Sequence, residues 1–166
     1  MNWTELLTSE LNEVSGIVQK LITRVDDSEL SWKPEEGENW MSLGQLLYHL
    51  GEASGMCFKC FMTGDWGFEE MAGMPPVESL PSVSSTTEAL ERVKADYELA
   101  MSCIKEAGEE RLDQDLVAAP WDPRKVPLGK QLLSMVQHLE SHKSQLYYYL
   151  KLQGKSVNTF TLYGMD

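Results

Sequence analysis

The chain contains three histidines, and their spacing makes them the residues most able to support chemistry. His138 and His142 are four residues apart, so on a helix their side chains lie on one face, one turn apart. His49 lies much earlier, in an apolar segment where Leu46 and Ala53 are its i−3 and i+4 neighbours. These neighbours place His49 at the margin of an apolar helix face, directed toward the interior or the mouth of a bundle.

Two histidines one turn apart, with a third from a facing helix, are suited to holding a divalent metal ion. Neutral imidazole nitrogens bind zinc at about 2.0–2.1 Å, and imidazole also suits nickel and iron. Three protein ligands leave a position for water or substrate, as in catalytic sites, whereas structural zinc usually has four ligands. Because three imidazoles carry no charge, the ion would lower the pKa of a bound water toward about 7. Such a site could supply hydroxide for hydrolysis, or bind and activate a thiolate.

The same three residues also have simpler explanations. A histidine pair at i and i+4 is often part of a solvated helix face, and a single buried histidine is often a hydrogen-bonded core residue. Three classes of function therefore stay open. The chain is a metal-dependent transferase or hydrolase, a non-catalytic bundle that binds a metal or small ligand, or a dimeric scaffold without metal.

Four segments show the apolar periodicity of helices, and no segment alternates convincingly with a period of two. Asn2 with Glu5, and Ser42 with Gln45, have the spacing of capping boxes, and Gly108 is placed to end the third segment. The predicted helices cover about residues 4–24, 42–62, 86–107 and 127–154.

The three connections between these segments are long, at roughly 16 to 22 residues each, and rich in Pro, Gly and Trp. Connections of this length can cross a whole bundle, so antiparallel neighbours cannot be assumed. In the second connection, Trp66, Phe68 and residues 71–76 could cover the site or a dimer face.

The sequence predicts an all-α fold, a four-helix bundle with long crossover loops, formed as a single domain by residues 1–166. The tail, residues 155–166, contains Phe160, Leu162 and Tyr163. We expect this apolar surface to dock on the bundle.

Composition excludes several classes of protein. The 166 residues include 14 Lys and Arg and 26 Asp and Glu, a formal net charge of −12, so backbone phosphates would repel the chain and no nucleic-acid partner is expected. No apolar segment approaches the roughly 18 to 20 residues that span a bilayer, and the first residues lack the pattern of a signal peptide. We therefore expect a cytoplasmic protein without a membrane partner.

The three cysteines agree with that compartment. Cys57, Cys60 and Cys103 are too few for a disulfide framework and indicate reduced thiols. Cys57 and Cys60 match a C-x-x-C pattern, but they lie late in a predicted helix without a βαβ unit around them. We interpret them as small apolar residues on a half-buried helix face.

Three stretches of the chain resemble motifs of the DinB family. Residues 30–34, L-S-W-K-P, and 40–50, W-M-S-L-G-Q-L-L-Y-H-L, are similar to the family's W-K-P … W-S-x-x-x-x-L-x-H-L segment. Residues 138–146, H-L-E-S-H-K-S-Q-L, are similar to its H-x-x-x-H-R-G-Q segment, with Lys143 for the usual Arg and Ser144 for the usual Gly. The resemblance covers nearly the whole chain.

The resemblance implies a four-helix bundle that is often a homodimer and holds a metal ion through His49, His138 and His142. Some family members are similar to transferases of low-molecular-weight thiols, which implies a small-molecule substrate of that kind. Related domains of sulfoxide synthases have a Glu where this chain has Ser144, so the resemblance disfavours an oxygenase.

A histidine that binds a metal usually donates its other N–H to an oxygen, which fixes its tautomer. Gln45 is one turn before His49, and Gln145 is three residues after His142, so either amide could serve. Tyr97, central on the third predicted helix, could also reach the pocket, although a core tyrosine is the simpler interpretation.

Overall fold

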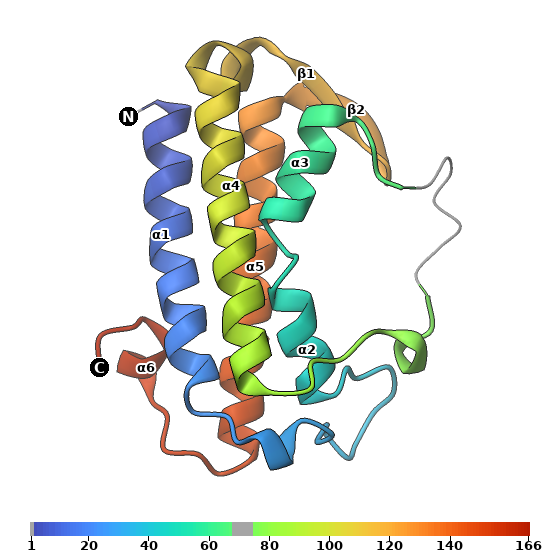
Figure 1. The fold of residues 1–166 in the computed structure, drawn as a ribbon, viewed down its shortest axis with the longest axis vertical. Helices are drawn as coiled ribbons and strands as arrows, with labels where there is room; N and C mark the ends of the chain where they lie inside the picture. Colours follow the sequence, from blue (N-terminus) through green and yellow to red (C-terminus); the bar gives the residue numbers. More distant parts are fainter. Residues whose placement is uncertain (1, 68–74) are drawn as a thin grey trace.

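Helix α1, Trp3–Ile22, begins at the predicted capping box and buries one face. The Asn2 side chain accepts from the backbone N–H of Glu5, and the Glu5 carboxylate accepts from the backbone N–H of Asn2. The computed structural model describes residues 2–67 and 75–166, in which α1 lies beside the other long helices of a bundle (Figure 1). The buried face of α1 is formed by Leu7, Leu11, Val14, Ile17, Val18, Leu21 and Ile22, with Ser15 also buried.

The other elements follow along the chain with a small hairpin before the last long helix. The helices are α2 Leu43–Leu50, α3 Gly55–Thr63, α4 Thr86–Gln114, α5 Leu128–Leu152 and the short α6 Thr159–Leu162. The strands are β1 Leu116–Ala119 and β2 Asp122–Pro127, and single 3-10 turns lie at Asp27–Glu29 and Val77–Ser79. The predicted helical bundle is confirmed.

The second predicted helix, residues 42–62, is two helices, and its continuity was predicted wrongly. Helix α2 starts at the predicted box, since Ser42 accepts from the Gln45 N–H, but it ends at Gly51. The buried carboxylate of Asp96 on α4 accepts hydrogen bonds from the backbone N–H groups of Ser54, Gly55 and Met56 and from the Ser54 hydroxyl, at 2.7–3.0 Å. Because this side chain satisfies the free N–H groups at a helix start, it stabilises a new helix, α3, at this point.

Helix α4 continues beyond the predicted end at residue 107. Gly108 has φ 62° and ψ 170° and interrupts the helix, but the helix resumes and reaches Gln114. The Glu109 carboxylate accepts from the backbone N–H groups of Trp3 and Thr4 at 2.9 and 3.0 Å. The added turns of α4 therefore cap the start of α1. The sequence around either helix end could not predict this contact, because its partners are more than 100 residues apart.

The hairpin of β1 and β2 is antiparallel and was not predicted. Its register pairs Leu116 with Pro127 and Val117 with Val126. The strands have four and six residues, and neither buries alternate side chains regularly, so no period of two exists in the sequence to detect.

The bundle has one long crossover. Helices α2, α3 and α4 all run in the direction opposite to α1, and α5 runs back beside them (Figure 1). Residues 64–85 therefore connect opposite ends of the bundle, as their length allowed. Phe68 and residues 71–74, which were considered as a cover for the site, lie outside the described residues.

The tail docks as expected, through Leu162 and through polar contacts. The buried Lys143 ammonium donates to the Leu162 carbonyl at 3.1 Å and to Glu140 at 2.6 Å. Lys20 donates to the Gly164 carbonyl at 2.7 Å. Phe160 and Tyr163 remain exposed, whereas Leu162, the third predicted apolar residue, packs against the core. In the described part of the chain, no helix combines the length and the apolar character that crossing a bilayer requires.

Candidate metal centre

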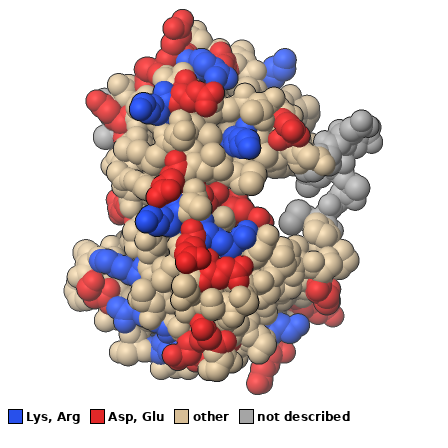
Figure 2. Space-filling model, viewed as in Figure 1, with Lys and Arg blue, Asp and Glu red and all other residues tan. Residues whose placement is uncertain are grey.

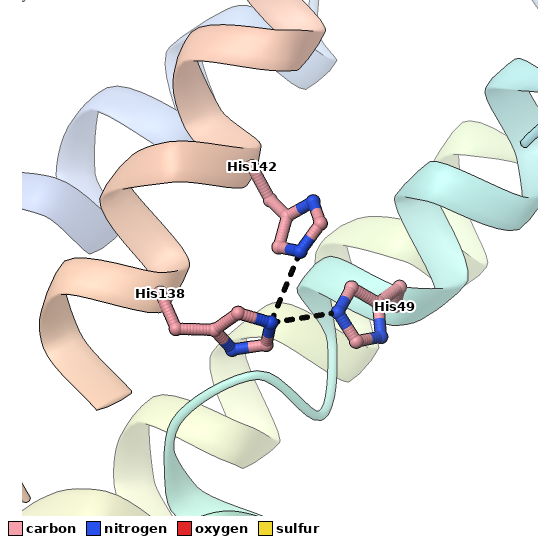
Figure 3. Close-up of side chains that lie close together, drawn as sticks. All are labelled: His49, His138 and His142. Carbon is pink, nitrogen blue, oxygen red and sulfur yellow. Dashed lines mark hydrogen bonds between the residues drawn. The ribbon is translucent and has the colours of Figure 1, made fainter. Parts of the chain in front are cut away.

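The three histidines meet between α2 and α5. His49 projects from α2, and His138 and His142 project from consecutive turns of α5, with their rings directed toward one another (Figure 3). The Nε2 atom of His138 lies 3.2 Å from Nε2 of His49 and 3.0 Å from Nε2 of His142. The three candidate ligand nitrogens all lie within 4.8 Å of one another.

Buried leucines on both helices fix where these rings can lie. On α2, Leu46 and Leu50 are buried in the core, and on α5 so are Leu139 and Leu146. Because the apolar faces of both helices pack inward, each histidine lies at the edge of its face, half-buried. Amphipathic packing thus brings together residues that are 89 positions apart in the sequence.

Two of the rings have an oxygen acceptor on their outer nitrogen. The Nδ1 atom of His142 lies 2.9 Å from Oε1 of Gln145, and Nδ1 of His138 lies 3.4 Å from the carbonyl oxygen of Ala53. An oxygen of either kind can only accept, so in the tautomers that these contacts favour both rings carry their proton on Nδ1, and both Nε2 atoms have a free lone pair. These two lone pairs are 3.0 Å apart and cannot bond to each other, which leaves them suited to share a cation.

The two separations from His138 fit ligands of one ion. Two nitrogens that are each about 2.0–2.1 Å from a metal lie about 3.0 Å apart at a right angle and about 3.4 Å apart at a tetrahedral angle. The observed separations of 3.0 and 3.2 Å fall within these limits. Three neutral imidazoles are a donor set that suits a divalent ion, and their candidate ligand atoms lie within 4.8 Å of one another.

Burial keeps the two α5 histidines neutral. It lowers the pKa of His142 to about 4, with further lowering from the nearby His49, because a low-dielectric surrounding disfavours imidazolium. Burial and His49 lower the pKa of His138 for the same reasons. Near pH 7 neither ring has to lose a proton before it binds a metal.

The break between α2 and α3 supplies a part of the site that the sequence analysis missed. In a continuous helix the Ala53 carbonyl would accept from the N–H four residues later, but here it is free to face His138. Gly51 and the Ser54–Gly55 pair, in the middle of an apolar helical pattern, were the available signal for a break.

Of the three expected outer partners, the structure places only Gln145 against a histidine. The Gln45 amide donates to the carbonyls of Val77 and Leu80 at 2.8 and 3.0 Å, so it holds the end of the crossover. The Tyr97 hydroxyl donates to the Asn12 side chain on α1 at 2.6 Å. Both side chains are thus committed elsewhere, because their direction depends on helix rotation that the sequence pattern did not resolve.

Glu52 lies close to the site, beside His49. Its carboxylate is 3.9 Å from Nδ1 of His49 and 3.7 Å from a guanidinium nitrogen of Arg92, while the side chain is 39 % exposed. The first distance exceeds a hydrogen bond, so Glu52 contributes negative charge behind His49 without fixing its ring.

The cysteines do not form a reactive centre. Burial, followed by the negative charge of Asp96, raises the pKa of Cys57 to about 12. Burial also raises the pKa of Cys60 and of Cys103. Cys57 lies in the first turn of α3 and not late in a helix, yet its thiol stays protonated, which supports the interpretation as a packing residue.

Charges of both signs are interspersed on one face of the molecule (Figure 2). On the face shown in Figure 2, Lys and Arg alternate with Asp and Glu, and no extended basic patch is visible.

Comparisons with known proteins agree with this architecture. A family model described as the DinB superfamily matches residues 10–146. The fold is similar to the crystal structure of a DinB-like protein, YjoA from Bacillus subtilis, with a TM-score of 0.68 and 18 % sequence identity over 94 % of this chain and 97 % of the other. No curated protein matches the chain.

Proposed function

Because the chain belongs to the DinB superfamily and brings three histidine Nε2 atoms together, we propose that it is a metal-dependent enzyme acting on a small molecule. In this proposal His49, His138 and His142 hold one divalent ion, with zinc, nickel and iron as the candidates. The observation that carries it is the 3.0 Å separation of the His138 and His142 Nε2 atoms, with the Nδ1 atom of each ring facing an oxygen.

Transfer of a low-molecular-weight thiol is the reaction that we favour. An ion with three neutral ligands supplies Lewis acidity, since it keeps its charge and lowers the pKa of a thiol or water that binds it. The raised pKa of Cys57 makes this side chain a poor nucleophile, so a reacting thiolate has to come from a second molecule. Hydrolysis is the second candidate, because the same site would also activate water.

The role of the chain's own residues is to hold the ligand nitrogens in place. Gln145 and the Ala53 carbonyl orient His142 and His138 through their Nδ1 protons. The proposal also includes a cytoplasmic homodimer, and the three free cysteines agree with a reducing compartment. Sedimentation of the purified protein tests the dimer.

Metal content tests the proposal most directly. Protein purified without a histidine tag and loaded with zinc should contain one ion per chain, and His49→Ala, His138→Ala or His142→Ala should each weaken binding by at least about tenfold. Gln137→Ala, an exposed change on α5, is the matched control and should bind as the wild type does. Substoichiometric zinc in both the wild type and His142→Ala would overturn the proposal.

Activity assays then separate an enzyme from a binding protein. The metal-loaded protein is incubated with a small thiol and an electrophile, and separately with activated esters. Conjugation that is lost in all three histidine variants supports the transferase, and ester cleavage with the same dependence supports the hydrolase. Zinc binding without either reaction would leave the non-catalytic bundle as the function.

A further inference from the structure

The two tryptophans of residues 30–42 are not explained by the metal ligands alone. Trp32 and Trp40 both pack edge-on against Tyr149 of α5, with ring centroids 5.3 and 6.2 Å away. Tyr149 is 1 % exposed, and its hydroxyl donates to the Met41 carbonyl at 2.9 Å. The segment before α2 therefore encloses one tyrosine and accepts the hydrogen bond that its hydroxyl donates.

The Tyr149 hydroxyl also connects to the metal centre. It lies 3.1 Å from Nε2 of Gln145, whose Oε1 lies 2.9 Å from Nδ1 of His142. A hydroxyl has one proton, and Tyr149 uses it to donate a hydrogen bond to the Met41 carbonyl. Toward Gln145 the Tyr149 hydroxyl oxygen can therefore only accept. The NH₂ group of Gln145 must therefore face Tyr149.

This order of donors determines the direction of the whole chain of hydrogen bonds. With its NH₂ group turned to Tyr149, Gln145 presents its oxygen to His142, and that oxygen can only accept. His142 must then carry its proton on Nδ1 and direct the lone pair of Nε2 toward His138. Burial raises the pKa of Tyr149, so the hydroxyl keeps the proton on which this order depends.

We propose that Tyr149 is a positioning residue for the metal centre: held by Met41, Trp32 and Trp40, it sets the orientation of the Gln145 amide and so the tautomer of His142. This inference rests on the proposed function, because the tautomer matters only where Nε2 binds an ion. It gives the W-K-P … W segment a role in the site, although none of its side chains is a ligand.

The test compares Tyr149→Phe with Tyr147→Phe. Tyr147 is also a buried tyrosine of α5, but its ring contacts are with Tyr148 and Lys151. Long-range proton–nitrogen NMR on metal-free protein reports the tautomer of each histidine, and titration gives the zinc affinity. We expect Tyr149→Phe to convert His142 to a mixture of tautomers, leave His138 in the Nδ1–H form, and weaken zinc binding about tenfold. Tyr147→Phe should change neither.

A rescue variant excludes a merely structural role for Tyr149. A carboxylate accepts through either oxygen and needs no orienting hydroxyl, so Gln145→Glu should restore the Nδ1–H tautomer of His142 in the Tyr149→Phe background. Gln145→Met leaves Tyr149 and both tryptophans intact and should lose the tautomer on its own, which keeps the test open if Tyr149→Phe does not fold.

Each outcome decides the inference. A His142 that stays in the Nδ1–H form in Tyr149→Phe, or in Gln145→Met where Tyr149→Phe does not fold, with zinc affinity within twofold of the wild type, overturns it. A wild type that binds no zinc, but whose His142 changes tautomer in Tyr149→Phe, supports the positioning role and overturns the proposed function instead.

Discussion

At the scale of single residues, the two kinds of potential metal ligand in this chain are prepared in opposite ways. His142 is neutral at pH 7 because burial lowers its pKa to about 4, so its Nε2 lone pair is available. Cys57 is also neutral, because burial and Asp96 raise its pKa to about 12, but for a thiol the neutral form is the unreactive one. Desolvation thus makes the His142 imidazole available as a ligand and makes the Cys57 thiol unreactive.

This contrast predicts the pH dependence of cysteine labelling. At pH 8 about a quarter of an ordinary thiol is thiolate, whereas about one in ten thousand Cys57 side chains is ionised at a pKa of about 12. Native Cys57 should react with iodoacetamide at least about a thousandfold more slowly than glutathione, and the rate should rise about tenfold per pH unit from 8 to 10. Mass spectrometry of the labelled peptides measures this, and labelling at the glutathione rate would contradict the raised pKa.

At the scale of elements, the features that could be predicted are those with local causes. The capping boxes at Asn2 and Ser42 join residues that are three apart, so both partners of each contact can be identified in the local sequence. The end of α2 and the start of α3 depend on Asp96, which is 42 residues away from Ser54. For the site, two ligands followed from the spacing of one helix and the third from its apolar face, but Ala53 and Tyr149 act through tertiary contacts.

The close contact between α3 and α4 predicts that adding one methyl group, at Gly55, strongly destabilises the fold. A Cβ atom on Gly55 would lie 2.0 Å from the Asp96 carbonyl oxygen, so Gly55→Ala has to separate two backbones and should destabilise the fold by about 1–3 kcal/mol or more. Gly55→Ala should also weaken zinc binding. It would displace the break between α2 and α3, which includes the Ala53 carbonyl that faces His138. Gly16→Ala on α1 is the matched control: a Cβ there meets nothing within 4 Å, and it should stabilise the helix by about 0.5–1 kcal/mol. Urea unfolding of both variants decides, and equal stabilities would refute the steric argument.

At the scale of the whole molecule, the candidate centre is formed by two helices, α2 and α5, that are far apart in the sequence. His49 follows the first connection, and the two α5 histidines follow the crossover and the hairpin, so the complete ligand set exists only when α2 and α5 are packed together. The unfolded chain holds these three side chains at no fixed distance. A bound ion should therefore stabilise the folded state as a whole and not one helix.

Thermal unfolding measures that coupling. Free zinc at about one hundred times its dissociation constant adds about 2.7 kcal/mol of stability when it binds only the folded state, which for a domain of this size raises the Tm by about 5–10 °C. Addition of a chelator should remove the increase, and His142→Ala should show at most about half of it, because it takes away one of three ligands and weakens binding by at least about tenfold. Gln137→Ala should keep the full increase. An equal rise in the wild type and in His142→Ala would mean that zinc binds elsewhere, since only an ion held by α2 and α5 together depends on that ring.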